Sequence, residues 1–419
     1  MSVFASRWAR VPDGCRELDP AALPAGFRAA GVAAGIKPAG RDVGLLHATG
    51  PAAASAARFT PSAVVGAPVT VSRAARLDAL RAVVVSSGNA NVADGERGLE
   101  TARAAQAATA RALGLEPDEV AVAATGVIGR ELPRDRLLAG IEAAASALGD
   151  DAGALSEAIL TTDQGPKRAC LEVELAGGLV HVSGQAKGAG MMAPAFVRSA
   201  TLICLVEIDA EIAPAPLDAL VGAAAARSFD RITVDGQLST SDTLVCLASG
   251  ASGVRVEAGS EDEARLGAAL EALLRVLALE IVRDGEGAGR IGRVVVRGAP
   301  AWVEPVARAV ADSPLVKTAL HGADPNFGRI LQAAGAALAA LGAGGDGSVP
   351  LDLRIEGRTL VTAGVVAELG DGLLAQLERA VAGREVEYEL GIPGSGGEAE
   401  LFFSDLGHGY VTLNAEYTT

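Results

Sequence analysis

Apolar runs alternate with helix-spaced segments in the first third of the chain. RAVVVSSGNANVADG predicts a buried strand over 81–85 that opens into a polar turn. RGLETARAAQAATARALG places Leu and Ala at helical spacing between charged residues, so it predicts a helix that covers a core. DEVAVAATGVIG predicts another strand that ends in a glycine-rich turn. ELPRDRLLAGIEAAASALG predicts a second helix, with Pro133 early in it.

From Ser156 the pattern changes to successive strands joined by short turns, with a hairpin marked by AGG. The later helices are predicted in DALVGAAAARSF, in EDEARLGAALEALLRVLALEIVRDGEGA, and, as helix, loop and helix, in PAWVEPVARAVADSPLVKTALHGADPNFGRILQAAGAA. The predicted strands are AILTTD, RACLEVELAGGLVHVSGQAKGAGMM, ATLICLVEIDAEI, DRITVDGQLSTSDTLVCLASG, RIGRVVVRGA, VPLDLRIEG, RTLVTAG, REVEYELGI and YVTLNAEYTT. This order predicts an α/β fold of layered mixed sheets with helices outside them, rather than a doubly wound parallel sheet.

Composition limits the classes of function. A chain of 419 residues predicts two or three domains, or one large intertwined unit. Half of the residues are hydrophobic and only 3% are aromatic, so the core has to consist of Ala, Val, Leu and Ile. The net charge of -15 and the lack of a basic run argue against binding of nucleic acid. No signal peptide and no membrane span are predicted, so we expect a cytoplasmic protein.

Several common catalytic motifs are missing from the sequence. The four cysteines are far apart, and the two within apolar runs, Cys204 and Cys246, are expected in the core. The four histidines do not pair at helical spacing, so no metal site is predicted. The chain also lacks a phosphate-binding GxxxxGK[ST] motif, a GxGxxG motif in the right context and the GxSxG motif of serine hydrolases.

Thr201 is the best candidate nucleophile. It follows Ala200 where the glycine-rich segment GQAKGAGMMAPAFVRSA enters the apolar run TLICLVEID. A threonine hydroxyl needs a base, and an N-terminal threonine can use its own amine. That requires a cut, in which Thr201 Oγ attacks the carbonyl of Ala200 and water releases the resulting ester. The alternative is that Thr201 is simply a β-branched first residue of a strand.

Three other segments carry candidate chemistry. Thr125 and Gly126 end a predicted strand, where a hydroxyl and a backbone N–H can form an oxyanion hole or an ordinary turn. Lys187 lies in a predicted glycine-rich turn, where it can bind a substrate carboxylate or stay solvated. Glu286 and Asp284 follow a helix C-terminus, against the helix dipole, which indicates either binding of an amine or a solvated turn.

Nine blocks in a fixed order cover nearly the whole chain, and they resemble the glutamate N-acetyltransferase family, also called the ornithine acetyltransferase family, of arginine biosynthesis. The blocks are GFRAAGVAAGIKPAGRDVGLL, VVVSSGNANVADGERGLE, AATGVIGRELP, AILTTDQGPK, AKGAGMMAP, SFDRITVDGQLSTSDT, EIVRDGEGA, SPLVKTALHGADPNFGRI and YVTLNAEYTT. The resemblance implies an α/β fold of the DmpA and ornithine acetyltransferase type, made of two intertwined pieces.

The resemblance also implies a mechanism. The family cuts itself before a threonine, and the matching bond is Ala200–Thr201. The alpha piece, 1–200, would carry the oxyanion hole and the cleavage loop, and the beta piece, 201–419, would begin with the nucleophile. Acetyl passes from N-acetylornithine to this threonine and then to glutamate, a ping-pong reaction without a cofactor. Two copies of each piece are implied, and use of acetyl-CoA as a second donor stays open.

Site residues follow from the same resemblance, position by position. Thr125 and Gly126 match the pair that stabilises the oxyanion. A lysine and a glutamate suit the carboxylate and ammonium groups of amino-acid substrates. The substrate-binding positions match Thr162, Lys187, Thr201, Glu286, Asn414 and Thr419. Thr161 is the alternative to its neighbour Thr162.

One departure from the family pattern lies in the cleavage loop. AFVRS fills 195–199 and makes the segment before Ala200 longer than in the family, with Phe196, Val197 and Arg198 as the added residues. TLICLVEID keeps the family's spacing to Asp209, which favours Thr201 over Ser199 as the nucleophile. Two alternatives stay open: a paralogue from secondary metabolism with a different acyl donor, and an uncut, non-catalytic binding protein.

Overall fold

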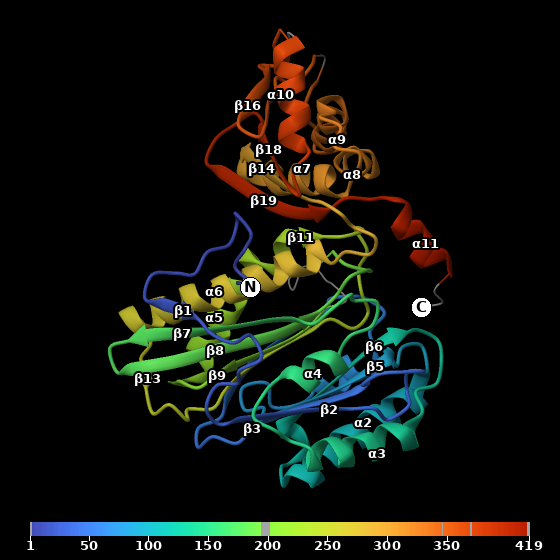
Figure 1. Ribbon diagram of the computed structural model, residues 1–419, viewed down its shortest axis with the longest axis vertical. Helices are drawn as coiled ribbons and strands as arrows, with labels where there is room; N and C mark the ends of the chain where they lie inside the picture. The colour runs from blue at the N-terminus through green and yellow to red at the C-terminus, as the bar shows by residue number, and fades with distance from the viewer. Residues whose placement is uncertain (1, 194–201, 346, 369–370, 417–419) are drawn as a thin grey trace. The chain divides into compact units, whose positions relative to one another are not determined.

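The computed structural model describes residues 2–193, 202–345, 347–368 and 371–416. The chain forms two compact units, each built around its own sheets (Figure 1). The described parts of unit 1 lie within Met1–Asp230 and Gln237–Ile281, and those of unit 2 lie within Arg231–Gly236 and Val282–Tyr417. The boundary between the units therefore falls within one long helix, α6 (Glu261–Arg283).

Unit 1 holds a six-stranded and a four-stranded mixed sheet. The six-stranded sheet has the order β1 (Cys15–Glu17), β7 (Lys167–Leu175), β8 (Gly178–Lys187), β9 (Ile203–Ile208), β12 (Thr243–Ala248), β4 (Ala54–Phe59). The four-stranded sheet has the order β2 (Phe27–Val32), β3 (Val43–Ala48), β5 (Ala82–Asn89), β6 (Val120–Val127). A short parallel pair consists of β10 (Glu211–Ile212) and β13 (Arg255–Val256).

The two sheets of unit 1 pack face to face, because their strands carry small and branched apolar residues on the facing sides. Leu205 and Val245 of the six-stranded sheet share one core with Leu46 and Val85 of the four-stranded sheet. Most helices cover the outer faces, whereas α4 (Gly153–Ala158) lies between the sheets and contributes Leu155 to their shared core (Figure 1). The helices of unit 1 besides α6 are α1 (Ala67–Arg73), α2 (Gly95–Leu113), α3 (Arg134–Ser146), α4 (Gly153–Ala158) and α5 (Pro214–Arg227).

Two contacts define the outer layers of unit 1. Ala105 of α2 and Ile141 of α3 join one core with Val84 and Val122 of the four-stranded sheet. On the six-stranded sheet, a Cβ at Gly184 would lie 3.1 Å from side-chain atoms of Leu273 and Leu277 in α6. Unit 1 is thus a helix–sheet–sheet–helix sandwich, and the predicted fold of layered mixed sheets with outer helices is confirmed.

Strand β9 has a special place in this sandwich. It pairs antiparallel with β8 and parallel with β12, so it lies in the middle of the six-stranded sheet. The predicted cleavage position precedes β9 in the chain. A cut there would leave β1, β4, β7 and β8 on one piece and β9 and β12 on the other. The predicted pieces would therefore share one sheet.

Unit 2 is a seven-stranded sheet with helices packed on it. The strand order is β11 (Ile232–Thr233), β19 (Gly397–Ser404), β14 (Ile291–Gly298), β18 (Glu385–Gly391), β15 (Asp352–Ile355), β16 (Arg358–Thr362), β17 (Val365–Val366). The helices are α7 (Pro300–Asp312), α8 (Pro314–His321), α9 (Phe327–Ala340), α10 (Asp371–Val381) and α11 (His408–Glu416). Val294 and Val296 of β14 share the apolar core with Val306 of α7 and Ala334 of α9.

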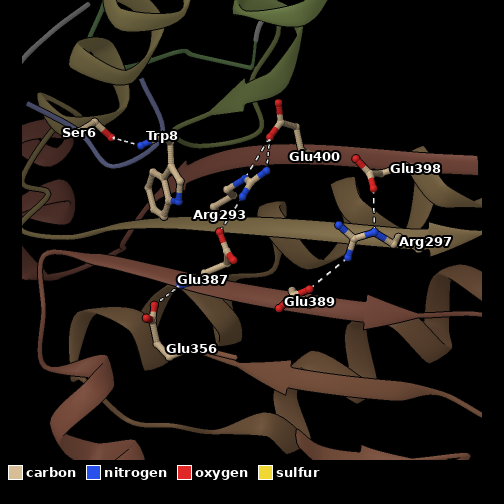
Figure 2. A network of polar contacts seen from close by, with 9 residues as sticks. All are labelled: Ser6, Trp8, Arg293, Arg297, Glu356, Glu387, Glu389, Glu398 and Glu400. Carbon is tan, nitrogen blue, oxygen red and sulfur yellow. Dashed lines mark hydrogen bonds and ion pairs between the residues drawn. The ribbon is translucent and has the colours of Figure 1, made fainter. Parts of the chain in front are cut away.

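Arginine and glutamate side chains form a charged ladder across the strands of unit 2 (Figure 2). Arg293 of β14 bonds Glu387 at 2.7 Å and Glu400 at 2.8 Å on the two neighbouring strands. Arg297, further along the same face of β14, has the same arrangement with Glu389 and Glu398 on the two neighbouring strands. Arg293 and Arg297 lie on one face of β14, and Val294 and Val296 lie on the other face, so the ladder and the apolar core are on opposite faces of the sheet.

Most predicted elements are confirmed, including the β7–β8 hairpin and the long helix α6. The segment 300–337, predicted as helix, loop and helix, instead contains parts of three helices, α7, α8 and α9. Two predicted strands are also wrong. AILTTD is not a strand, because α4 ends at Ala158 and a turn follows. YVTLNAE is helical within α11 rather than a strand: its alternating pattern is overridden by bonds that Tyr410 and Asn414, four residues apart, make from one face of the helix.

Candidate functional site

Thr125 and Gly126 lie near the end of β6, where it runs parallel to β5. Gly126 has a φ of +125°. A Cβ on it would lie 2.4 Å from the carbonyl carbon of Gly88 and 2.7 Å from the nitrogen of Asn89. Glycine is therefore required at this position, because the two strand backbones approach too closely for a side chain. The close approach fixes the backbone beside the Thr125 hydroxyl.

Lys187 is the last residue of β8 and not part of a solvated turn, so the sequence prediction for its surroundings is wrong. Its side chain is only 2% exposed. Its Nζ donates to Thr125 Oγ1 at 3.4 Å and lies 3.8 Å from Asp163 Oδ2. The buried ammonium group therefore lies beside two polar side chains at the end of β8.

Asp163 organises this end of unit 1. Its side chain is fully buried and accepts hydrogen bonds from Lys167 Nζ at 2.7 Å, the Gly188 amide at 2.7 Å and the Thr161 amide at 3.0 Å. Burial alone would raise the pKa of Asp163, but Lys187 and Lys167 outweigh burial and hold the pKa well below its usual range. Asp163 is therefore an ionised, buried carboxylate.

A third lysine lies near this carboxylate. Lys37 follows β2, and its Nζ donates to the carbonyl of Leu160 at 3.0 Å. Burial lowers the pKa of Lys37, and the charge of Lys187 adds to that effect, while Asp42 and Asp163 oppose it. This end of unit 1 thus carries an excess of positive charge, which suits an anionic ligand or an oxyanion.

A second buried carboxyl group lies beside the start of β9. Asp242, just before β12, accepts a hydrogen bond of 2.6 Å from the amide of Leu202. Asp242 is fully buried, and burial raises its pKa well above the usual range, although the bond from Leu202 and the charge of Lys187 act in the opposite direction. Leu202 directly follows the candidate nucleophile in the sequence.

The remaining described candidates lie in unit 2. Glu286 follows the end of α6, as predicted, and is 8% exposed. Asn414 Nδ2 of α11 donates to Glu286 Oε2 at 2.7 Å. One turn earlier, the Tyr410 hydroxyl donates to Asp235 at 3.3 Å. These two bonds attach α11 through one side of the helix to acidic residues from two other segments.

The structure thus brings some predicted site residues together. Thr125 and Lys187 are in contact in unit 1, and Glu286 and Asn414 are bonded in unit 2. Thr161 and Thr162 are both half-buried next to Asp163, so their burial does not separate them. Three predicted residues lie outside the described parts of the chain: Ala200, Thr201 and Thr419.

Sequence reasoning did not select Asp163, Asp242 or Lys37 as site residues. The two aspartates lie in the family-like blocks AILTTDQGPK and SFDRITVDGQLSTSDT: Asp242 directly precedes β12, and Asp163 lies in the segment that leads into β7. An aspartate at the entrance of a buried strand is the signal that could have identified them, because such a carboxyl group needs buried donors.

The described ranges contain no group of three or more His, Cys, Asp or Glu side chains that could hold a metal ion. Within the same ranges, every helix is too short or too polar to cross a membrane. Cys204 and Cys246 are buried, as predicted.

Comparisons with known proteins give consistent matches over the length of the chain. The model of the ArgJ family matches residues 28–419. Two relatives named arginine biosynthesis bifunctional protein ArgJ come from Chlorobaculum tepidum and Nitratidesulfovibrio vulgaris. The first is 37% identical over 94% of this chain and 96% of its own length. The second is 41% identical over 94% of this chain and 99% of its own length.

Solved structures with similar sequences were also found. Ornithine acetyltransferase complexed with ornithine from Mycobacterium tuberculosis is 38% identical, with a TM-score of 0.41. The alignment covers 43% of this chain and 98% of that chain. An arginine biosynthesis bifunctional protein ArgJ from Bacillus halodurans is 35% identical, with a TM-score of 0.40, and covers 43% of this chain and 97% of its own.

Proposed function

The chain belongs to the ArgJ family of acetyltransferases in arginine biosynthesis, and from this membership we propose that it moves acetyl from N-acetylornithine to glutamate through an acetyl-threonine at Thr201. The observation that carries the proposal is the family match over 28–419, which includes each residue that the reaction needs. The contact between Thr125 and Lys187 at the end of two buried strands supports it.

The first half-reaction is acyl transfer to the enzyme. The Thr201 hydroxyl attacks the acetyl carbonyl of N-acetylornithine, and the free amine of Thr201 takes the hydroxyl proton. Negative charge develops on the carbonyl oxygen, where the Gly126 N–H and the Thr125 hydroxyl are the proposed donors. The C–N bond then breaks, the proton passes to the departing amine, and ornithine leaves an acetyl ester on Thr201.

The second half-reaction reverses these steps with glutamate. Its amine attacks the acetyl ester, the same donors stabilise the oxyanion, and the threonine hydroxyl is regenerated. The substrate-binding roles carried over to Thr162, Glu286, Asn414 and Thr419 are part of the proposal. Glu286 suits an ammonium group, because it is a mostly buried carboxylate whose partner, the Asn414 amide, is a neutral donor.

The nucleophile requires a prior cut between Ala200 and Thr201. We propose that the chain cuts itself there into 1–200 and 201–419. The six-stranded sheet supports this, since the two pieces would stay joined by the pairing of β9 with β8 and of β12 with β4. Assembly into two copies of each piece, a cytoplasmic location and use of acetyl-CoA as a second donor complete the proposal.

A denaturing gel and mass spectrometry of the purified protein test the cut. Two species, each about half of 41.9 kDa, are expected. Thr201→Ala should give one intact chain without turnover, and Ser199→Ala should behave like the wild type. Cutting of the Thr201→Ala chain at the same bond would exclude Thr201 as the nucleophile. An intact wild-type chain that still binds ornithine would favour a non-catalytic binding protein.

Acetyl transfer to glutamate, measured with N-acetylornithine and with a panel of other N-acetyl amino acids, tests the substrate. N-acetylornithine is expected to give the highest kcat/KM. The longer segment AFVRS before the cleavage position motivates the panel, because it could alter the choice of donor. A clear preference for another donor would identify a paralogue with a different acyl substrate.

A further inference from the structure

While Lys187 is protonated, the hydrogen bond between Lys187 and Thr125 can have only one direction, from the lysine to the hydroxyl oxygen. An ammonium group has three N–H donors and no acceptor, whereas a hydroxyl has one donor and two acceptor lone pairs. Lys187 Nζ therefore donates, and Thr125 Oγ1 accepts, at 3.4 Å. The Thr125 hydroxyl has to direct its own hydrogen elsewhere. Within the described ranges, no second group is hydrogen-bonded to this hydroxyl.

Asp163 stabilises the protonated lysine and fixes its position. Its carboxylate lies 3.8 Å from Lys187 Nζ, and neither side chain is exposed by more than 2%. A charge pair in such a buried place interacts more strongly than one in water. Asp163 also accepts from the amide of Gly188, the residue after Lys187, so it holds the backbone as well as the charge.

We infer that Lys187 and Asp163 are positioning residues that direct the Thr125 hydroxyl hydrogen toward the oxyanion. The inference rests on the proposed function, in which Thr125 is an oxyanion donor. Lys187 accepts no proton and touches no reacting atom in this role: it occupies a lone pair of the hydroxyl oxygen, so the donor side of the hydroxyl is available for the acetyl oxygen.

A neutral Lys187 would reverse this arrangement. An amine has a lone pair, so the Thr125 hydroxyl could donate to Nζ and turn away from the oxyanion. The charges that face Lys187 decide how readily it loses its proton: Asp163 and Lys167 from the segment before and at the start of β7, Lys37 after β2, and Asp242 before β12. Asp163 is the ionised acid among them that contacts Lys187.

A double-mutant cycle with Thr125→Val and Lys187→Met separates this role from direct binding of a substrate carboxylate. Thr125→Val should lower kcat by about 10²–10³-fold, as for the loss of one oxyanion donor. Lys187→Met should lower kcat by about 10–10²-fold, the range for one charged hydrogen bond, with little change in KM. The double variant should be no slower than Thr125→Val, because the lysine acts through the hydroxyl.

The variants are chosen to keep the fold. Met is close to Lys in length, and Asp163 keeps its bond to Lys167 in Lys187→Met, so no buried charge is left without a partner. Thr125→Ser keeps the hydroxyl and should retain most of the activity. If Lys187→Met instead raises KM, and the two effects multiply in the double variant, Lys187 binds substrate directly and the inference is wrong.

The pH profile gives an independent test. Asp163→Asn removes the negative charge that favours the ammonium form of Lys187, so kcat should fall with rising pH at a lower pH than in the wild type. Lys167→Met keeps the contact between Asp163 and Lys187. In this variant the alkaline limb of the profile, where kcat falls with rising pH, should stay at the wild-type pH or move to a higher pH. The same alkaline limb in Asp163→Asn and the wild type would contradict the inference. If Asp163→Asn does not fold, the double-mutant cycle decides alone.

The cycle can be measured with p-nitrophenyl acetate as well as with N-acetylornithine, since both donors form an oxyanion on acetyl transfer. One outcome would overturn the proposed substrate but keep the inference: N-acetylornithine is not a donor, and the effects of Thr125→Val and Lys187→Met on kcat with p-nitrophenyl acetate are not additive. Turnover of N-acetylornithine with independent effects of the two variants would overturn the inference and keep the proposed function.

Discussion

The amide of Leu202 donates a hydrogen bond of 2.6 Å to the fully buried carboxyl group of Asp242. The two residues are adjacent across the start of the parallel pair β9–β12, where the next pair in register is Ile203 and Thr243. The nitrogen in this bond belongs to the peptide that follows Thr201. Asp242 therefore holds the chain on the C-terminal side of the candidate nucleophile.

Asp242→Ala should be destabilising, whereas Asp242→Asn should be mild. Burial raises the pKa of Asp242 well above its usual range, which favours the protonated carboxyl group, and an amide is the close substitute for that form. Asn keeps an oxygen that can accept from Leu202, but Ala leaves a buried N–H unpaired, at a cost of about 1–3 kcal/mol. Urea unfolding of Thr201→Ala chains carrying each substitution measures both effects without interference from the cut.

The same two substitutions also test whether Asp242 affects the cut. In the wild-type background, Asp242→Ala should slow the appearance of the two pieces on a denaturing gel, and Asp242→Asn should not. If Asn and Ala are equally harmful to stability and cutting, the carboxyl group is ionised in the folded protein and the argument from burial fails.

Gly126→Ala should impair both folding and turnover. Its φ of +125° is strained for alanine, and the new Cβ would lie 2.4 Å from the backbone of Gly88. Strain of this kind costs about 1–3 kcal/mol, and separation of β5 from β6 would also move the Gly126 N–H out of its proposed place in the oxyanion hole.

Gly129→Ala is the matched control for Gly126→Ala. Gly129 also has a positive φ, +76°, but a Cβ there would meet nothing within 4 Å. Gly129→Ala should lower the free energy of unfolding by about 1 kcal/mol, because alanine is strained at this φ, and should leave kcat unchanged. Melting temperatures and kcat of the two variants separate conformation from steric contact. Equal losses in both would show that the approach of Gly126 to Gly88 has no special importance.

The fold could be predicted from the sequence wherever one element carries a clear period. β8 alternates apolar or small residues with polar ones from Val180 to Lys187, β9 is an apolar run that contains only Glu207 as a polar residue, and α6 has a helical pattern over 23 residues, so local pattern and tertiary structure agree. The α11 segment misleads because its alternation of Tyr410, Val411, Thr412 and Leu413 is typical of a strand. Its helical form depends on partners far away in the sequence, which local patterns do not reveal.

The site was only partly predictable for a similar reason. Resemblance to a family identified Thr125 and Lys187 as separate positions, but it did not show that they touch. Their contact arises because β8 of one sheet and β6 of the other end at the same place in the sandwich. Asp163 joins them across a turn that was expected to be a strand. Contacts of this kind depend on the packing of two sheets, which no local pattern encodes.

Asn414→Asp should loosen α11. The new carboxylate would face Glu286 Oε2 in place of an amide donor at 2.7 Å, so attraction would become repulsion. Amide hydrogen exchange in 408–416 should accelerate, and KM for N-acetylornithine should rise if Glu286 binds its ammonium group. Asn414→Ala, which only removes the bond, should have a smaller effect on exchange, and Tyr410 should still bond Asp235.

Thr412→Asp is the matched control, because it adds the same charge at an exposed position of the same helix. Exchange in 408–416 should stay near the wild-type rate in this variant. If Thr412→Asp and Asn414→Asp accelerate amide hydrogen exchange equally, the added negative charge itself weakens α11. The bond between Asn414 and Glu286 would then not be what stabilises this helix.

Glu207 should make the stability of the folded protein fall with rising pH. It is fully buried in β9, where it accepts from Ser183 Oγ at 2.6 Å and Gln185 Nε2 at 3.1 Å. Burial raises the pKa of Glu207 to about 8. Because the unfolded chain has the ordinary value of about 4.3, the stabilisation is complete below that pH and is lost as the pH rises toward about 8.

Glu207→Gln removes this dependence, because the amide keeps the shape and the oxygen acceptor but has no proton to lose. Between about pH 5 and 8, the free energy of unfolding of the wild type should fall relative to Glu207→Gln by about 1.4 kcal/mol per pH unit. Urea unfolding at several pH values, again in Thr201→Ala chains, measures the difference. Parallel curves would mean that Glu207 has the same pKa in the folded and unfolded chain, and that its bonds to Ser183 and Gln185 offset the effect of burial.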